Sequence, residues 1–186
     1  MSHPIIASLW LAWAIIWLVA AGSAKTTRRR ESLRSQALHR LPLFIAAALM
    51  IWRRPLPPPL MERFLPATPA VAALGVIMVA AGLGFAVWAR WYLGANWSGM
   101  VTVKVQHELI RTGPYRYVRH PIYTGLLLAI AGTAAALGEW RDAIAFGLAF
   151  FAFIVKSRVE ERWMGETFPE YESYRRATAA LVPFIY

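Results

Sequence analysis

The chain has 186 residues, of which 58% are hydrophobic and only 16% are charged. A soluble domain of this length could hardly bury so much apolar surface, so the composition favours a single-domain integral membrane protein. A net charge of +10 can indicate nucleic-acid binding, but here the basic residues fall between apolar runs, so we expect no nucleic-acid partner. The absence of cysteine excludes disulfides, thiolate metal sites and cysteine nucleophiles.

About five transmembrane helices are predicted from the apolar stretches at residues 4–24, 40–52, 68–93, 121–138 and 142–156. The first is longer than the apolar part of a signal peptide and no Lys or Arg precedes it, so we interpret it as a retained helix. The second is short for a span, so it either borrows residues 35–40 or forms a half-buried helix that does not span the bilayer. Residues 55–60 are mostly proline and are predicted to be non-helical, because proline removes backbone donors.

The distribution of basic residues predicts the orientation in the membrane. Sixteen of the Lys and Arg residues lie in segments 25–40, 90–120 and 156–186, and four lie in the intervening segments. By the positive-inside rule, the N-terminus is predicted outside and these three segments in the cytoplasm. The Ala- and Arg-rich composition suggests a bacterial source, and hence the bacterial inner membrane.

Two short patterns predict how the helices pack. The link Glu139-Trp-Arg-Asp142 is so short that the last two spans must form an antiparallel hairpin. Gly82 and Ala86 are four residues apart in the third span, a small-residue pair that favours close helix packing.

Residues 94–125 are unusually polar and aromatic for so apolar a chain. Gly113-Pro114 marks a turn, and Pro121 stands where the fourth helix should begin. His120 is then the expected cap, and the unpaired backbone N–H groups around it would suit an anion. A zinc site using His107 and His120 is disfavoured because no third histidine lies nearby, so we predict no metal.

Three aromatic residues and one arginine in this stretch have a simpler interpretation as membrane-interface anchors. They are Tyr115, Tyr117, Arg119 and Tyr123.

A second polar cluster runs from Lys156 to Glu161 at the inner end of the fifth span. Lys156 and Glu160 are four residues apart and share a helix face. Adjacent carboxylates at membrane depth are costly unless they are paired, although a snorkelling lysine and solvated glutamates remain an alternative. Residues 162–177 are predicted to form a pair of interfacial helices broken at Pro169.

These residues together resemble a known family. The chain reads His107-x-Leu109-x-x-x-Gly113-Pro114-Tyr115-x-x-x-Arg119-His120-Pro121-x-Tyr123-x-Gly125, followed by an apolar hairpin, Glu160-Glu161, Phe168-x-x-Tyr171-x-x-Tyr174 and Pro183. This order resembles the isoprenylcysteine carboxyl methyltransferases and the wider group of membrane phospholipid methyltransferases. The resemblance covers roughly residues 90–186, whereas the preceding part matches only in being membrane-spanning.

The resemblance implies an all-α membrane protein with an S-adenosylmethionine pocket at the cytoplasmic face, capped by a C-terminal interfacial segment. Residues 1–93 would then supply N-terminal helices and residues 94–186 the catalytic half. By matching positions, the cofactor-binding residues would be His107, Glu108, Leu109, Ile110, Tyr115, His120, Pro121, Ile122 and Tyr123.

Lys156 and Glu160 occupy the positions that the resemblance assigns to catalysis at the acceptor, and we add Glu161 and Arg119 as substrate-binding residues. The family usually has arginine where this chain has Lys156, and lysine cannot form arginine's planar bidentate clamp.

The function implied is methyl transfer from S-adenosylmethionine to a lipophilic small molecule or lipid at the membrane interface, with a carboxylate as the favoured acceptor. One alternative is N-methylation of a phospholipid or amine, which would need a base such as Glu160 or His120. Another is a sterol-type NADPH reductase, although such enzymes often have Gly-Glu where this chain has Thr124-Gly125. A non-catalytic scaffold or transporter is a third, but no inverted repeat is visible.

Overall fold

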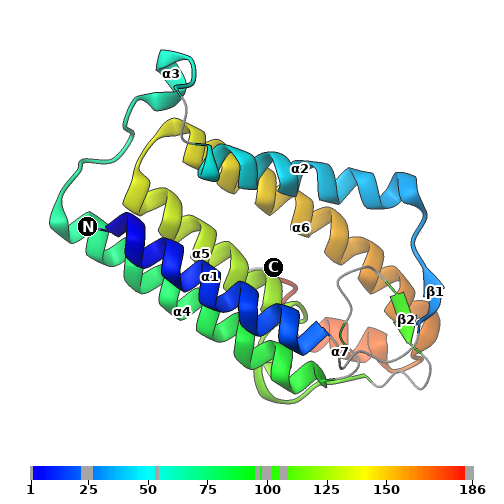
Figure 1. The fold of residues 1–186 in the computed structure, drawn as a ribbon. Helices are drawn as coiled ribbons and strands as arrows, with labels where there is room; N and C mark the ends of the chain where they lie inside the picture. The colour runs from blue at the N-terminus through cyan, green and yellow to red at the C-terminus, as the bar shows by residue number, and fades with distance from the viewer. Residues whose placement is uncertain are drawn as a thin grey trace.

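The computed structural model describes residues 2–21, 27–52, 55–94, 97, 102–104 and 109–182. The long helices of this part of the chain are α1 (Ser2–Ala21), α2 (Leu33–Ile51), α4 (Pro69–Leu93), α5 (Pro121–Leu137) and α6 (Trp140–Thr167) (Figure 1). Shorter elements are α3 (Pro58–Met61), the 3₁₀ helix η2 (Gly113–Arg116) and α7 (Tyr171–Ala177). Strand β1 (Thr27–Arg30) pairs antiparallel with β2 (Thr102–Lys104). The fold is helical as predicted, but this small ribbon was not foreseen.

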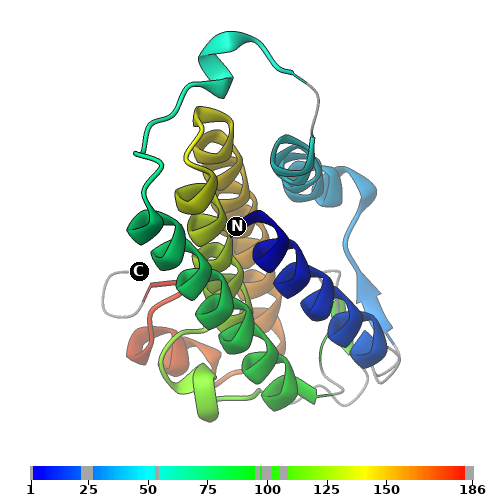
Figure 2. The ribbon, with the colours of Figure 1, turned by 60° about the vertical axis from the view of Figure 1, so that its left-hand side comes forward.

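The helices form one elongated bundle. α1, α4 and α5 lie side by side, α6 follows next to α5, and α2 packs along α6 on the side away from α4 (Figures 1 and 2). The turn between α5 and α6 is short, as predicted, because Gly138 adopts φ 74° and ends α5. Glu139 and Asp142 then form a reciprocal capping box at the start of α6, which satisfies backbone donors at that end.

The seam between α4 and α5 is lined by glycines. A Cβ atom added to Gly75 would lie 2.6 Å from the carbonyl oxygen of Gly132, and one added to Gly125 would lie 2.5 Å from the carbonyl oxygen of Gly82. Ala86, the other member of the predicted small-residue pair, is fully buried and meets Gly125. Close packing at Gly82 and Ala86 is therefore confirmed, and it brings the two backbones into direct contact.

Two predicted helix boundaries need correction. The second helix begins at Leu33, because Ser32 caps it by accepting the backbone N–H of Ser35 at 3.3 Å, so the short apolar stretch does gain the turns before residue 40. The fifth helix does not end at residue 156, since the residues up to Thr167 contain no proline and continue α6 without a break. The predicted interfacial pair is thus wrong in its first member, and only α7 is separate.

The expectation that residues 55–60 are non-helical is also wrong for their last part. Pro58 and Pro59 lie in the first turn of α3, where a backbone donor is not required and the fixed φ of proline suits a helix. Residues 55–57 are non-helical, as predicted.

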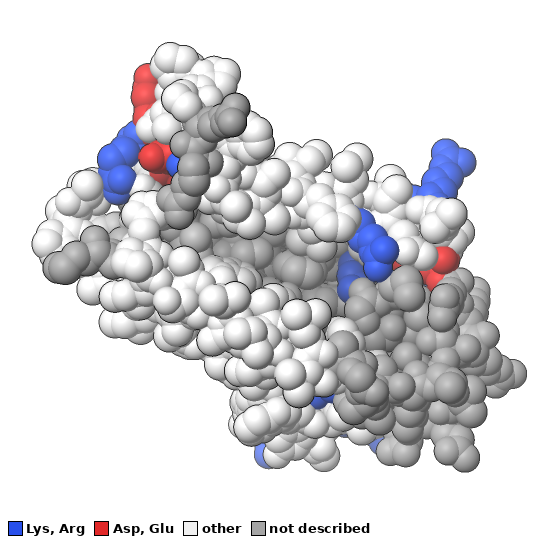
Figure 3. Space-filling model, viewed as in Figure 1, with Lys and Arg blue, Asp and Glu red and all other residues white. Residues whose placement is uncertain are grey.

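One face of the bundle is apolar between two charged ends. Figure 3 shows Lys, Arg, Asp and Glu gathered near the two ends of the face in view, with few over the described parts of α1, α2 and α4 between them. Exposed side chains of these three helices include Leu18, Phe44 and Ile77. By length and composition, α1 and α4 can each cross a bilayer, while α5 is an apolar but shorter helix. The structure thus agrees with a membrane protein, and the count of about five spans stays a prediction.

The end of the bundle away from the polar motifs is held by arginines. The Arg63 guanidinium donates to the carbonyl oxygen of Leu137 at 2.6 Å. Arg141 pairs with Glu139 at 2.7 Å and donates to the carbonyl oxygen of Trp52, also at 2.7 Å. These contacts tie the end of α5 to the segment after α3, and the end of α2 to the start of α6.

Candidate active site

The polar motifs meet at one end of the bundle, where α4 and α6 end and α2 and α5 begin (Figure 1). The approach to this end is the turn at η2. Gly113 adopts φ 58°, and a Cβ atom there would lie 2.5 Å from Cδ1 of Tyr92, so this turn requires glycine. The turn buries Tyr115 between the bundle and the C-terminal segment.

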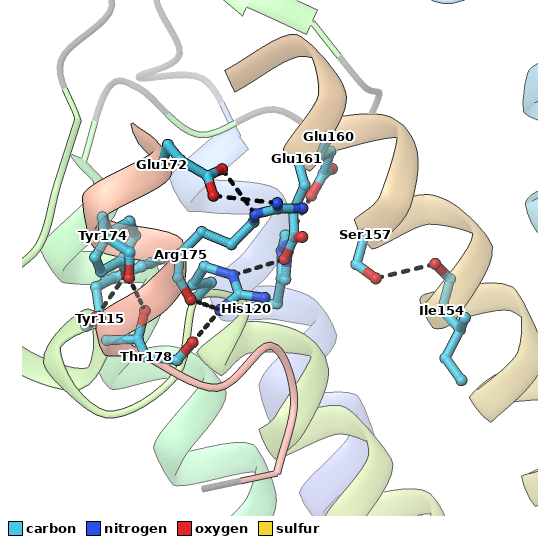
Figure 4. Close-up of polar contacts among 11 residues, drawn as sticks. Tyr115, His120, Ile154, Ser157, Glu160, Glu161, Glu172, Tyr174, Arg175 and Thr178 are labelled. Atoms are coloured by element: carbon cyan, nitrogen blue, oxygen red, sulfur yellow. Dashed lines mark hydrogen bonds and ion pairs between the residues drawn. The ribbon is translucent and has the colours of Figure 1, made fainter. Parts of the chain in front are cut away.

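His120 stands at the centre of the cluster (Figure 4). Its Nε2 lies 3.1 Å from a carboxylate oxygen of Glu161 and its Nδ1 lies 3.4 Å from one of Glu160. Burial disfavours the charged imidazole, but the hydrogen bonds and charges of the two glutamates outweigh burial and raise the pKa of His120. Both glutamates therefore favour the protonated imidazole, whose two ring nitrogens face their carboxylates.

Arg119 joins the C-terminal segment to α6. Its Nε donates to Glu161 at 2.7 Å, and its Nη1 donates to the carbonyl oxygens of Arg175, at 2.9 Å, and Thr178. Although burial opposes ionisation of Glu161, its contacts with His120 and Arg119 lower its pKa to about 2. Glu161 and Arg119 thus form an ion pair with each other in this structure. Their assignment to substrate binding stays a prediction.

Tyr123 connects the cluster to the interior of α6. Its hydroxyl donates to Glu160 at 2.6 Å, and its ring stacks on His120 at 5.4 Å and on Phe153 at 4.8 Å. The Lys156 Nζ lies 5.3 Å from the centre of the same ring. Lys156 and Glu160 therefore both meet Tyr123, as their shared helix face predicts.

The C-terminal segment closes over the start of α5. The backbone N–H groups of Arg119 and His120 donate to the carbonyl oxygens of Ala179 and Ala180 at 2.9 and 3.0 Å. The hydroxyl of Tyr174 donates to the carbonyl oxygen of Tyr115 at 2.6 Å (Figure 4). The sequence predicted unpaired donors around His120 that would receive an anion; this is wrong for these two N–H groups, because the chain's own carbonyls pair with them.

Several predicted cofactor residues come together beside this cluster. Ile110, Tyr115, Ile122 and Tyr123 share one apolar cluster with Ala89 of α4, where the further members are Trp17, Leu93, Trp97 and Leu126. Pro121 is fully buried and Leu109 is half-buried. His107 and Glu108 lie outside the described residues, as does Pro183. Nothing in the described part of the chain forms a metal-binding group of three or more His, Cys, Asp or Glu residues.

A polar pair in the N-terminal half was not predicted from the sequence. His39 of α2 lies 2.9 Å from the carboxylate of Glu31, and both side chains are only 1% exposed. The available signal was the spacing of Glu31, Ser35 and His39 by four residues each, which places them along one side of a helix start.

Helices with an apolar outer face and a buried charged site at one end are the features of a membrane-embedded enzyme. The model of the phospholipid methyltransferase family matches residues 70–171. Because this is more than half of the 186 residues, the chain belongs to that family of methyltransferases. The resemblance inferred from the motif is thereby confirmed.

Curated relatives support this membership. The chain is 30% identical over 120 residues to the cobalt-zinc-cadmium resistance protein CzcN of Cupriavidus metallidurans, covering 62% of this chain and 50% of that protein. It is 32% identical over 119 residues to a probable protein-S-isoprenylcysteine O-methyltransferase of Oryza sativa subsp. japonica, covering 62% of each. It is 31% identical over 123 residues to the protein-S-isoprenylcysteine O-methyltransferase of Saccharomyces cerevisiae, covering 64% and 52%. The chain thus spans about half of the length of CzcN and 62% of the length of the relative from Oryza sativa.

Proposed function

We propose that this protein transfers the methyl group of S-adenosylmethionine to a carboxylate on a lipophilic acceptor at the membrane interface. The observation that carries the proposal is the cluster of Lys156, Glu160 and Tyr123, next to an apolar cluster and at one end of a bundle with an apolar outer face.

The residues present suit the cofactor. S-adenosylmethionine supplies a methyl group already activated by a positively charged sulfur, so the protein chiefly has to bind and align the reactants. Tyr115 offers an aromatic ring to a cation, and Glu160 offers a carboxylate. Ile110 and Ile122 provide apolar contact for the rest of the molecule.

The charges favour a carboxylate over an amine as the acceptor. A carboxylate is ionised at neutral pH and needs no base, only a cation to orient it, which Lys156 supplies. An amine must first lose a proton. His120 is paired with two glutamates that raise its pKa, and Glu160 already accepts from Tyr123, so neither is placed as a free base.

The depth of Lys156 favours an acceptor that reaches the site from the bilayer. Phe151, whose side chain is exposed on the outer surface, precedes Lys156 by five residues, or about 7.5 Å of helix rise. An acceptor with a long apolar part would keep that part in the bilayer while its polar end meets Lys156 and Glu160. A fully water-soluble acceptor would not need this depth.

Cofactor binding is tested with the purified protein in detergent. S-adenosylhomocysteine is expected to raise the melting temperature, since a ligand that binds the native state stabilises it. Tyr115→Ala should weaken this shift, whereas Leu38→Ala, on the exposed side of α2, should leave it unchanged. Stabilisation by NADPH and not by S-adenosylhomocysteine would favour the reductase alternative.

The acceptor is tested by incubating the protein with labelled S-adenosylmethionine and a membrane lipid extract. A methyl ester releases labelled methanol in mild base, and an N-methyl group does not. Base-stable product would refute the carboxylate and support N-methylation. Absence of any labelled product despite cofactor binding would refute the transfer reaction itself.

A further inference from the structure

A buried histidine in α2 is held in one orientation. Its Nε2 lies 2.9 Å from the carboxylate of Glu31. That glutamate is fixed in turn, because the Ser35 hydroxyl donates to its other oxygen and the Gln36 amide donates to its backbone carbonyl at 2.9 Å. His39 is therefore anchored through Glu31 at the start of α2.

This anchoring determines which nitrogen of His39 is protonated. A carboxylate only accepts hydrogen bonds, so Nε2 carries the proton and donates to Glu31. In the neutral imidazole, Nδ1 then presents a lone pair. Nδ1 is buried and has no hydrogen-bond partner within the described residues. A buried polar atom without a partner is unusual enough in a folded protein to need an explanation.

The pair belongs to the surroundings of the acceptor cluster. α2 packs along α6, the helix that carries Lys156 and Glu160. Glu31, just before α2, lies close enough to act electrostatically on both Lys156 and Tyr123, and Arg40 of α2 acts on Lys156. Yet α2 precedes residues 70–171, the part that matches the family model. The N-terminal half therefore contributes polar groups next to residues assigned to the acceptor.

We propose that His39, oriented by Glu31, is a positioning residue for the acceptor, and that its Nδ1 accepts a hydrogen bond from an N–H or O–H group beside the methylated carboxylate. This rests on the proposed function and narrows the acceptor class. The polar end of the acceptor then carries an anion for Lys156 and a hydrogen-bond donor for His39. The hydrogen bond to Nδ1 of His39 does not involve the residues of the predicted cofactor pocket.

The variant His39→Gln separates the two contacts of the imidazole. A glutamine side chain reaches as far as Nε2 and can still donate to Glu31, but it has no acceptor atom at the position of Nδ1. Labelled methyl transfer is measured over a range of concentrations of membrane lipid extract, together with S-adenosylhomocysteine binding and melting temperature. Loss of one neutral hydrogen bond should raise the apparent KM for the extract about threefold to tenfold, with kcat and cofactor affinity little changed.

Two comparison variants make the result specific. His39→Asn places an amide oxygen near the position of Nδ1 but does not reach Glu31, so the proposal expects a lower melting temperature with an apparent KM close to that of the wild type. Thr133→Val removes two hydrogen bonds away from the site, the one that Thr133 accepts from Trp10 at 3.1 Å and the one that it donates to the carbonyl oxygen of Ala129 at 2.9 Å. It should lower the melting temperature without changing the apparent KM.

Each outcome decides the proposal. An unchanged apparent KM in His39→Gln overturns it and leaves His39 with a purely structural role. If His39→Gln does not fold, an apparent KM in His39→Asn that rises with the loss of stability overturns it equally. If the wild type binds S-adenosylhomocysteine but labels nothing in the extract, the proposed function fails and this inference fails with it. That case is recognised because the wild type and all variants are then equally inactive.

Discussion

Adding one methyl group at the seam between α4 and α5 should separate the two helices. In Gly82→Ala, the new Cβ would lie 2.6 Å from the backbone nitrogen of Ala129, whereas ordinary contacts begin at 3.4 Å, a shortfall of about 0.8 Å. Backbone atoms of a packed helix cannot rotate away, so α5 must shift. Overpacking of this kind costs about 1–3 kcal/mol.

Gly84→Ala is the matched control, because Gly84 lies on the same helix two residues away and its Cβ would meet nothing within 4 Å. Both changes improve helix propensity by about 0.5–1 kcal/mol, so their difference isolates the seam. Thermal unfolding in detergent should give a lower melting temperature for Gly82→Ala than for Gly84→Ala. Equal melting temperatures would refute the close contact. Since α5 begins next to His120, we also expect Gly82→Ala to weaken S-adenosylhomocysteine binding.

Three further predictions address orientation, acceptor and pH. Reporter fusions after Arg34 and at the C-terminus should both score as cytoplasmic, and a periplasmic signal from either would contradict the orientation drawn from the basic residues. Lys156→Ala should lower turnover far more than cofactor affinity, because its proposed role is to orient the acceptor, and Lys156→Arg should keep part of the activity; an equal loss of cofactor binding would contradict that role. The pKa of His120 is raised above 6.5, so its ion pairs with Glu160 and Glu161 stabilise the folded protein below that pH. This stabilisation is lost as the pH rises through the raised pKa of the folded state. Melting temperatures measured upward from pH 6.5 should therefore fall more for the wild type than for His120→Asn. Parallel curves of melting temperature against pH would refute the raised pKa of His120.

Much of the helical architecture follows from patterns that are local in the chain. Proline at the start of α5, glycine at its end and the short link to α6 determine the hairpin, because each acts through its own backbone angles or donors. The shared face of Lys156 and Glu160 follows from helical spacing alone. The far end of α6 was misjudged because apolar composition marks where a membrane span ends, and a helix can continue beyond it into water.

The tertiary structure decided which polar groups are paired. The sequence shows Arg119 and Glu161 42 positions apart, and only folding places the guanidinium on that carboxylate and on carbonyls of the C-terminal segment. The same holds for Glu31 and His39, whose nearness to Lys156 depends on α2 packing along α6. Contacts within one helix turn are fixed by helix geometry, so sequence spacing predicts them. Contacts between distant segments depend on how the helices pack, so residues with the same spacing can end up in a site or in a structural ion pair.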